Sequence, residues 1–228
     1  NYKNIIDTNI IDNKLNLFIY KITLKTFLLI DNKIHFGKFK LESKNTYNKI
    51  LSTISQPSNI YEKITIVEGW NKKDLNKIFN KNFKEYVELD YDKIIADTYM
   101  FSAGSSFNEF KKQLDKRYLL IKNKYKNHYL LQKYSFKEIL IIGSLLEKEG
   151  LDFNDKRNIY SVINNRLNNK IKLQIDATVI FSLTGGNKNL DRKLTYEDLR
   201  INHPYNTYYN YGLPPGSGHF LCRYKTMN

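Results

Sequence analysis

The sequence predicts an α+β fold, because segments with the patterns of strands and of helices alternate along it. Residues 34–41 alternate apolar and polar side chains, and residues 63–67 form a short apolar-rich run, as strands do. Residues 135–149 and 155–169 instead repeat apolar side chains every three or four positions, as amphipathic helices do. Hydrophobic residues make up 41% and charged residues 26% of the 228 positions, which is typical of a globular chain rather than a disordered one.

The N-terminal region, residues 1–60, combines short apolar runs with polar turns. Two apolar runs occupy residues 15–20 and 26–30. After the predicted strand at 34–41, the spacing of apolar residues predicts a helix over 45–54. Residues 55–59 (Ser-Gln-Pro-Ser-Asn) are typical of a linker. The inner face of the helix would carry Tyr47, Ile50, Leu51 and Ile54.

Residues 61–130 are expected to form an intermediate α/β segment. The predicted strand at 63–67 ends at Glu68-Gly69-Trp70, and a helix is predicted over residues 72–79. The charged segment 101–126 predicts a long helix that follows a turn of small residues at 102–106. Trp70 is a candidate for stacking on a sugar ring, but a lone tryptophan is more often part of a core, and we favour the core.

The C-terminal region, residues 131–228, contains the clearest helix signals. Ser135 and Glu138 have the spacing of a capping box, in which each side chain bonds the other residue's backbone N–H. Gly150 lies where a glycine cap would end this helix. The next helix carries Arg166 in its apolar face, and a buried charge of this kind needs a carboxylate partner. The full inner face would carry Ile159, Val162, Ile163, Arg166 and Leu167.

Cysteine and histidine usage excludes several classes of site. Cys222 is the only cysteine, so the chain can form no internal disulfide and no cysteine-based metal cage. The four histidines are scattered without the spacing of metal ligands. No run of 18 or more apolar residues, as a membrane-spanning helix requires, occurs in the sequence. We therefore expect neither a metal ion nor a cofactor.

The net charge of +14 allows two explanations. Lysine, asparagine, isoleucine and tyrosine are abundant throughout, which is typical of an AT-rich coding sequence. Alternatively, the charge attracts a polyanion, which could be nucleic acid, anionic lipid or the acidic cell wall. The lysines are spread along the chain without a block of five or six like charges, which favours the compositional explanation.

Two glutamates, Glu147 and Glu149, lie at the end of the predicted helix 135–149. Glu149 falls in the last turn, where unsatisfied carbonyl groups and the negative end of the helix dipole disfavour an ionised carboxylate. Together with desolvation by apolar neighbours, this position raises the pKa, and a protonated glutamate is suited to protonate a glycosidic oxygen. Glu147 points about 200° away around the helix and is expected to be solvated or structural. Taken alone, a Glu-Lys-Glu triplet at the end of a helix, like residues 147–149, most often consists of solvated charged side chains.

Five short blocks follow one another in the second half of the chain. They are GSLLEKE at 143–149, VINNRL at 162–167, LQIDATVI at 173–180, YNTY at 205–208 and GLPPG at 212–216. Their order and spacing resemble the YceG-like (MltG-type) family of endolytic murein transglycosylases. Weaker matches precede them, at FGKF (36–39), VEGW (67–70) and ADTY (96–99). The resemblance extends over about residues 30–216.

The resemblance implies a lytic transglycosylase, a lyase that cuts the β-1,4 bond between MurNAc and GlcNAc in peptidoglycan. It places the catalytic acid at Glu149, the second glutamate of Glu-Lys-Glu. One glutamate would protonate the leaving oxygen and then accept the proton of the MurNAc 6-hydroxyl as a 1,6-anhydro ring closes, whereas ordinary glycosidases use two carboxylates. No second acidic residue is obviously paired with Glu149 in the sequence. The implied fold has a LysM-like subdomain at 1–60 and the catalytic part at 131–228.

Five further residues are candidates for contact with the glycan. They are Asn165, Gln174, Asp176, Asn206 and Tyr208. Gln174 and Asp176 alternate along a predicted strand and would face the cleft together, while the asparagines and the tyrosine can bond N-acetyl and hydroxyl groups. Two alternatives stay open: Asp176 as the buried partner of Arg166, and residues 205–208 as a tyrosine-rich turn. The loop at 212–216 is expected to be structural because its prolines and glycines fix its path.

The resemblance also implies an anchor in the cytoplasmic membrane, with the catalytic domain facing the periplasm or wall, and work beside glycan-polymerising synthases. Because the chain begins with Asn1 rather than methionine, we expect the anchor in a segment before it. Residues 217–224 depart from the family's pattern, which continues into a further wall-facing segment. We therefore expect a truncated or altered C-terminus.

Two other classes of function compete with an enzyme. A wall-binding module that has lost catalysis would agree with the altered C-terminus, and a Glu149→Gln change that leaves glycan products unaltered would favour it. A nucleic-acid-binding protein is suggested by the net charge alone. No zinc finger, RNP motif or helix-turn-helix signature supports it, so we expect no nucleic-acid partner.

Overall fold

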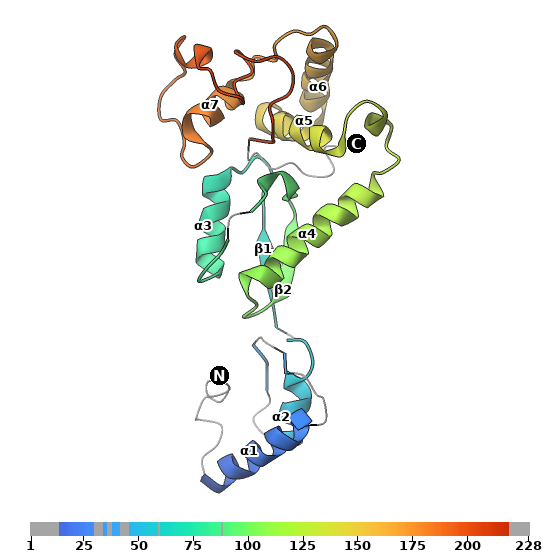
Figure 1. Ribbon diagram of the computed structural model, residues 1–228, viewed down its shortest axis with the longest axis vertical. Coiled ribbons are helices and arrows are strands. Elements are labelled where there is room, and N and C mark those ends of the chain that lie inside the picture. Colours follow the sequence, from blue (N-terminus) through green and yellow to red (C-terminus); the bar gives the residue numbers. More distant parts are fainter. Residues whose placement is uncertain are drawn as a thin grey trace. The chain divides into compact units, whose positions relative to one another are not determined.

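The computed structural model describes residues 14–29, 34–35, 38–41, 46–58, 60–87 and 89–218 (Figure 1). Within these residues it contains seven α-helices and one two-stranded sheet, so the predicted α+β class is confirmed. The chain divides into two compact units. The first comprises Asn1–Glu62 and Met100–Ser105, and the second comprises Lys63–Tyr99 and Ser106–Asn228. Residues 1–13 and residues 219–228, which include Cys222 and most of the segment where we expected an altered C-terminus, lie outside the described residues.

The regular elements alternate between helix and strand only in the first half of the chain. The helices are α1 (Lys14–Leu29), α2 (Tyr47–Ile54), α3 (Lys72–Asn82), α4 (Phe107–Lys124), α5 (Phe136–Glu149), α6 (Phe153–Asn168) and α7 (Asp176–Thr184). The strands are β1 (Tyr61–Thr65) and β2 (Thr98–Ser102). Three short 3-10 helices are η3 (Tyr91–Lys93), η4 (Tyr129–Gln132) and η5 (Asp198–Arg200).

The first unit is built from α1 and α2. The two apolar runs expected near its start belong to one continuous helix, α1, as far as residue 29. The helix predicted over 45–54 is confirmed as α2, where the side chain of Thr46 caps the N-terminus by accepting from the N–H of Lys49. Leu51 and Ile54 are buried, as expected of its inner face, whereas the side chain of Tyr47 lies outside the description.

The strand predicted over residues 34–41 is wrong for the described part of that segment, which has no regular structure; residues 36–37 are outside the description. Its apolar side chains Ile34 and Phe39 pack against the buried face of α2 instead of forming one face of a sheet. Its backbone bonds are irregular too, because the N–H of His35 donates to Ile54 O at 2.9 Å and that of Lys38 to Ala103 O at 2.8 Å. Ile34 and Phe39 lie five positions apart and would fall on opposite faces of a strand, so the packing of both on α2 does not follow the alternating pattern.

The sheet consists of β1 and β2 alone among the described residues. The strand predicted at 63–67 is confirmed, but β1 lies two residues earlier, at Tyr61–Thr65. Its partner β2 was missed because residues 101–106 were assigned to the start of a long helix and its turn. That helix is confirmed as α4 and begins at Phe107, where Ser106 and Glu109 form a capping box.

Aromatic rings join α3 to α4 in the second unit. The predicted helix at 72–79 is confirmed as α3 and continues to Asn82. The rings of Phe79 and Phe83 lie 5.2–5.9 Å from those of Phe107 and Phe110, between ring centroids. Edge and tilted arrangements at such distances are favourable for aromatic pairs.

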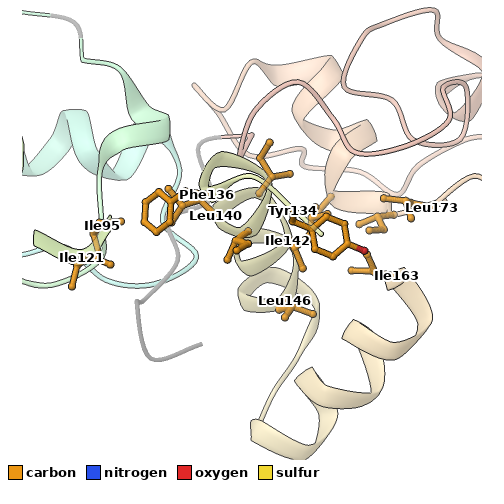
Figure 2. Packing of buried hydrophobic residues seen from close by; sticks show 14 residues of the cluster. Ile95, Ile121, Tyr134, Phe136, Leu140, Ile142, Leu146, Ile163 and Leu173 are labelled. Carbon is orange, nitrogen blue, oxygen red and sulfur yellow. The ribbon is translucent and has the colours of Figure 1, made fainter. Parts of the chain in front are cut away.

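Helix α5 is the centre of the main hydrophobic core (Figure 2). Its side chains are buried continuously from Ile139 to Leu146, as expected for a helix that is enclosed on most sides. Its neighbours in the core include Ile95 after η3, Ile121 of α4 and Ile163 of α6. This burial fixes the direction of α5 and therefore the place where it ends.

Helix α6 packs against α5 and confirms the helix predicted over 155–169. Ile163 is buried as expected, but Val162 is 51% exposed, so that member of the predicted inner face is wrong. Arg166 also has a different partner from the carboxylate we expected. Its Nη1 donates to the backbone carbonyl of Leu173.

The strand predicted through Gln174 and Asp176 is wrong, because Asp176 is the first residue of α7. Gln174 has a positive φ of 54°, a left-handed conformation that interrupts any strand. The β-branched residues of this block favoured a strand in the sequence. In the structure, Thr178 donates its hydroxyl to Ile175 O at 2.6 Å and closes the first turn of the helix instead.

The described residues contain neither a helix able to span a membrane nor a cluster of potential metal ligands. No helix within them has the length and apolar character that crossing a bilayer requires. No group of three or more histidine, cysteine, aspartate or glutamate side chains in the same part of the chain is placed to hold a metal ion.

Candidate active site at the end of helix α5

The position of the candidate site depends on where α5 begins and ends. The predicted capping box is confirmed: Ser135 N–H donates to Glu138 Oε2 at 2.7 Å, and Glu138 N–H donates to Ser135 Oγ at 3.2 Å. The helix ends at Glu149, with Gly150 as its C-terminal cap. Both ends are therefore fixed by local chemistry, and the burial between them leaves the last turn at a defined position.

Gly150 ends the helix for a reason other than a left-handed conformation. Its φ of −96° and ψ of 134° are open to any residue. A Cβ atom added there would lie 2.4 Å from Lys156 Cγ and 3.0 Å from Leu146 O, which is closer than real Cβ contacts. The glycine is needed because α6 passes close to the end of α5.

Glu147 is structural, which is one of the two roles expected for it. Its side chain is only 6% exposed, and Oε2 lies 2.5 Å from Lys156 Nζ. A carboxylate buried to this extent requires such a partner, because an unpaired buried charge is strongly unfavourable. The close approach of Lys156 that Gly150 permits is therefore also the approach that neutralises Glu147.

Glu149 emerges on the other side of the helix and remains accessible to solvent. Desolvation by the surrounding protein is the largest cause that raises the pKa of Glu149, and the negative charge of Asp176 is the next. The positive charge of Lys148 and a hydrogen bond from the N–H of Ala177 lower that pKa, and the net direction is upward. The raised pKa agrees with the argument from the helix end, but Asp176 is a neighbour that the sequence argument did not provide.

Asp176 and Tyr208 form one hydrogen-bonded unit beside Glu149. The Tyr208 hydroxyl donates to Asp176 Oδ1 at 2.6 Å. Burial and this bond to Asp176 raise the pKa of Tyr208 to about 12, so the phenol stays protonated and keeps its donor role near neutral pH. The charge of Glu149 raises the pKa of Tyr208 as well, which places the three groups together. Asp176 is exposed and bonded to Tyr208, so the alternative of a buried partner for Arg166 is not supported.

A pair of threonines fastens the Tyr208 loop to the start of α7. The hydroxyls of Thr178 and Thr207 lie 2.8 Å apart, and Thr207 Oγ1 also accepts from Ile175 N–H at 3.0 Å. The backbone N–H of Gln174 donates to Thr207 O at 3.1 Å. These buried bonds hold Tyr208 next to Asp176 although 32 positions separate the two residues.

The other predicted glycan contacts lie in different surroundings. Gln174 is exposed beside the Tyr208 loop and stays a candidate. Asn165 is exposed on α6, where its Oδ1 accepts from Asn169 Nδ2 at 2.8 Å. Asn206 is fully buried: its Nδ2 donates to Leu199 O and Ile201 O at 3.1 and 2.8 Å, and its Oδ1 accepts from Tyr208 N–H at 2.9 Å. The direct sugar contact expected of Asn206 is therefore not supported, because its amide is used to shape the loop.

The loop of residues 212–216 and the following Ser217 pack against Tyr205 and Asp92. Ser217 donates to Asp92 Oδ1 through its N–H at 2.9 Å and its hydroxyl at 3.0 Å. A Cβ atom at Gly216 would lie 2.6 Å from the Tyr205 hydroxyl and 2.9 Å from both carboxylate oxygens of Asp92. The structural role expected of this loop thus has a physical basis in the close packing of Gly216.

Sequence reasoning missed Asp92 and the backbone N–H of Ala177, and it gave Asp176 the wrong local structure. Asp92 follows Asp90 and Tyr91 in a short 3-10 helix and carries no motif of its own. Trp70 is half-buried, so it is not a clear core residue. Its neighbour Gly69 has a φ of 72°, and an added Cβ there would lie 3.7 Å from Glu147 O, so this turn packs beside the end of α5.

The arrangement has a defined chemical capacity. A solvent-accessible carboxyl group with a raised pKa can donate a proton near neutral pH and accept it back. The neighbouring Asp176 carboxylate is held by a phenol and can stabilise a positive charge that develops on a bound substrate. Glu149 and Asp176 together therefore provide the proton donor and the stabilising negative charge that acid–base cleavage of a single bond requires.

Comparison with known proteins identifies relatives of the chain. The model of the YceG-like family matches residues 2–217. A Bacillus subtilis protein named endolytic murein transglycosylase is 37% identical over 142 residues, which are 62% of this chain and 38% of that protein. A Streptococcus pneumoniae protein of the same name is 40% identical over 81 residues, which are 35% of this chain and 14% of that protein. This chain therefore spans well under half the length of these relatives.

A solved structure shares the fold. The crystal structure of a yceG-like protein from Listeria monocytogenes superposes with a TM-score of 0.61, covering 92% of this chain and 79% of that one. The sequences are 23% identical over this match, so the likeness concerns the fold. It extends the similarity over both units of the present chain.

Proposed function

This chain belongs to the YceG-like family, and on that premise we propose that it is an endolytic murein transglycosylase with Glu149 as its catalytic acid. The substrate would be the un-crosslinked glycan strand of peptidoglycan, cut at the β-1,4 bond between MurNAc and GlcNAc. The observation that carries the proposal is the position of Glu149, which is accessible, has a raised pKa and lies beside Asp176.

The proposed reaction has two steps that share one glutamate. Protonated Glu149 donates its proton to the glycosidic oxygen, the bond from that oxygen to C1 of MurNAc breaks, and the GlcNAc end leaves as an alcohol. The Glu149 carboxylate then takes the proton of the MurNAc 6-hydroxyl while that oxygen attacks C1 and closes the 1,6-anhydro ring. Because the nucleophile belongs to the substrate, its effective concentration is high and no water is consumed. Glu149 ends the cycle protonated.

Asp176 and Tyr208 have supporting roles in this proposal. C1 becomes positively charged as the bond breaks, and the Asp176 carboxylate stabilises that charge. The negative charge of Asp176 also raises the pKa of Glu149 and so keeps Glu149 protonated until the substrate takes its proton. Tyr208 holds Asp176 through a 2.6 Å hydrogen bond. Gln174 is tied to the same loop through its bond to Thr207 O, and its side chain would bond an N-acetyl or hydroxyl group of the substrate. Asn165, on the exposed face of α6, is a more peripheral contact in the proposal.

We also propose the finer features that the family resemblance implies. The first unit would be a LysM-like subdomain that binds glycan. A segment before Asn1 would anchor the protein in the cytoplasmic membrane, with the second unit on the side of the periplasm or wall, where the proposed substrate lies. Glycan-polymerising synthases would be its working partners. The net charge of +14 supports attraction to the acidic wall or to anionic lipid in that setting.

Mass spectrometry of glycan products tests the proposed reaction. Purified chain, its Glu149→Gln variant and a Glu85→Gln control are incubated with un-crosslinked peptidoglycan. Glu85 is an exposed glutamate away from the site, so its change should leave the products unaltered. We expect products ending in 1,6-anhydro-MurNAc from the parent and from the control, and none from Glu149→Gln. Reducing ends would mean a hydrolase, and no product from a folded parent would favour a wall-binding module.

A further inference from the structure

A pocket lies on the face of α5 that carries Glu147 and points away from Glu149. It has a volume of about 930 Å³, which is within the range of roughly 300–1,000 Å³ that ligand pockets have. Its floor is a stripe of α5 residues three or four positions apart: Ile139, Ile142, Gly143, Leu146 and Glu147. Because Glu149 points about 200° away from Glu147 around the helix, this pocket is distinct from the candidate active site.

Aromatic side chains form the walls of this pocket. They are Tyr129, Tyr134, Phe153 and Tyr160. The ring of Tyr134 is fixed, because it is buried against the core and its hydroxyl donates to Asn164 Oδ1 at 2.9 Å (Figure 2). Tyr129 and Phe153 are 65% and 64% exposed, so their faces are open to a guest at the rim. Burial raises the pKa of Tyr160, and the neighbouring Tyr134 and Tyr129 add to that shift, which places the three phenols close together.

One end of the pocket is polar. Its charged lining residues are Glu68, Glu147, Asp152, Lys156 and Arg157. Glu147 and Lys156 hold each other in place at 2.5 Å, and Asp152 is fixed as the N-cap of α6, where it accepts from Asp155 N–H at 2.9 Å. The pocket therefore presents hydrogen-bond donors and acceptors in fixed positions beside flat aromatic faces.

We propose that this pocket binds an N-acetylated hexose unit of a glycan strand, as a second sugar site away from the bond that is cut. A pyranose ring has an apolar C–H face that packs on aromatic rings and a rim of hydroxyl groups that bond carboxylates and cations. A purely apolar guest would desolvate the Glu147–Lys156 pair without replacing its contacts with water. A polyanion would meet three carboxylates and only two cations.

The inference rests on the proposed function, because it is the murein glycan that would occupy both sites. The pocket extends along α5 from Ile139 to Glu147, and Glu149 lies in the last turn of the same helix. A helix with its side chains is only about 10–12 Å across. A strand long enough to pass around the end of α5 would contact both of them, whereas a short oligosaccharide would occupy one. The second site would therefore strengthen the binding of long strands through a raised effective concentration.

Binding of chitotetraose, a β-1,4-linked GlcNAc oligomer without stem peptides, tests the pocket directly. The full chain is compared with a Tyr129→Ala/Phe153→Ala variant by calorimetric titration and by NMR shifts of residues in α6. The control is Leu119→Ala/Tyr196→Ala, which removes two side chains of the second unit that are 55% and 83% exposed and outside the pocket. We expect the pocket variant to bind about tenfold more weakly, equivalent to ~1.4 kcal/mol, and the control to bind as the parent does. In the pocket variant, the rate at which long glycan strands are cleaved should fall more, relative to the parent, than the rate at which short strands are cleaved.

The outcomes separate this inference from the proposed function. Equal chitotetraose affinity in the parent and the pocket variant would overturn the sugar site, even if Glu149→Gln abolishes anhydro products. Loss of affinity in the pocket variant would support the sugar site even if the parent forms no anhydro product. A free stem peptide that shifts the α6 resonances where chitotetraose does not would also overturn it, and would assign the pocket to the peptide part of murein.

Discussion

A methyl group added at Gly150 should weaken the end of α5 in a way that the structure makes quantitative. The new Cβ of Gly150→Ala would lie 2.4 Å from Lys156 Cγ, 3.3 Å from Lys156 Cα and 3.0 Å from Leu146 O. The Cγ atom belongs to a flexible side chain and can move, but the other two atoms belong to the backbones of α6 and α5. The lysine must therefore shift, and the two helices must separate slightly.

Two costs add to the expected change in stability. Overpacking of this kind costs about 1–3 kcal/mol. A shift of Lys156 also loosens its bond to Glu147, whose side chain is 6% exposed; breaking such a buried pair completely costs roughly 3–5 kcal/mol. Lys156 is 23% exposed and can follow Glu147, so only part of that second cost applies. We expect the free energy of unfolding to fall by about 2–4 kcal/mol, which for a chain of this size lowers Tm by roughly 4–16 °C.

Urea and thermal unfolding of the parent, Gly150→Ala, Lys156→Ala and the double variant measure these terms. In the Lys156→Ala background the 2.4 Å contact no longer exists, so Gly150→Ala should cost at least about 1 kcal/mol less there. The slope of unfolding free energy against urea should stay constant, because the surface exposed on unfolding is unchanged. An unchanged Tm for Gly150→Ala, or an equal cost in both backgrounds, would refute the close-packing explanation of this glycine.

Three further predictions concern charges and hydrogen bonds. Glu149 must be protonated to act as an acid, so formation of anhydro product should fall as pH rises through the raised pKa of Glu149. Asp176→Asn removes the negative charge that is the second cause of the raised pKa. The alkaline limb of the pH profile should therefore move to lower pH in this variant. An unmoved limb would count against the electrostatic role of Asp176. Tyr208→Phe removes the 2.6 Å bond to Asp176 and should reduce product formation about tenfold, or ~1.4 kcal/mol, whereas Tyr196→Phe at an exposed site should have no effect. Hydrogen bonding to Arg192 is the main cause that lowers the pKa of Asp198, so this pair stabilises the fold fully above the unfolded pKa of about 4 and loses that effect progressively as pH falls from there through the lower folded pKa. Arg192→Ala should therefore lower Tm more at pH 7 than at pH 2, and an equal loss at both values would contradict the ion-pair explanation.

The parts of the fold that the sequence predicted correctly are those set by neighbours in the chain. The capping box of Ser135 and Glu138 and the apolar spacing of α5 act within one or two helical turns, and both are found. Gly150 also ends α5 as predicted, but it does so without a left-handed conformation and is needed because α6 packs against it. The helix α6 was also predicted from its apolar spacing, but the exposure of Val162 depends on which neighbours pack against it. Periodicity predicts that a face is apolar, and only tertiary packing decides how wide the buried face is.

The wrong predictions occur where contacts outside a segment decide its structure. At 34–41, α2 covers Ile34 and Phe39, which would lie on opposite faces of a strand, so the alternating pattern does not produce one. The block around Gln174 and Asp176 has β-branched residues, yet bonds between Thr207 and this segment fix a left-handed turn followed by a helix. Local preference for strand is weak compared with such buried long-range bonds.

The acidity of Glu149 shows most clearly why the site could be located but not fully constructed from the sequence. The C-terminus of α5 disfavours the ionised carboxylate, as the sequence alone indicates. The structure adds the start of α7, where the N–H of Ala177 favours the ionised form and Asp176 opposes it. These two effects come from adjacent residues, so both depend on the position at which α7 begins. Desolvation makes the largest contribution to the raised pKa of Glu149, and the start of α7 adds a contribution that depends on the threonine contacts holding the 205–208 loop in place.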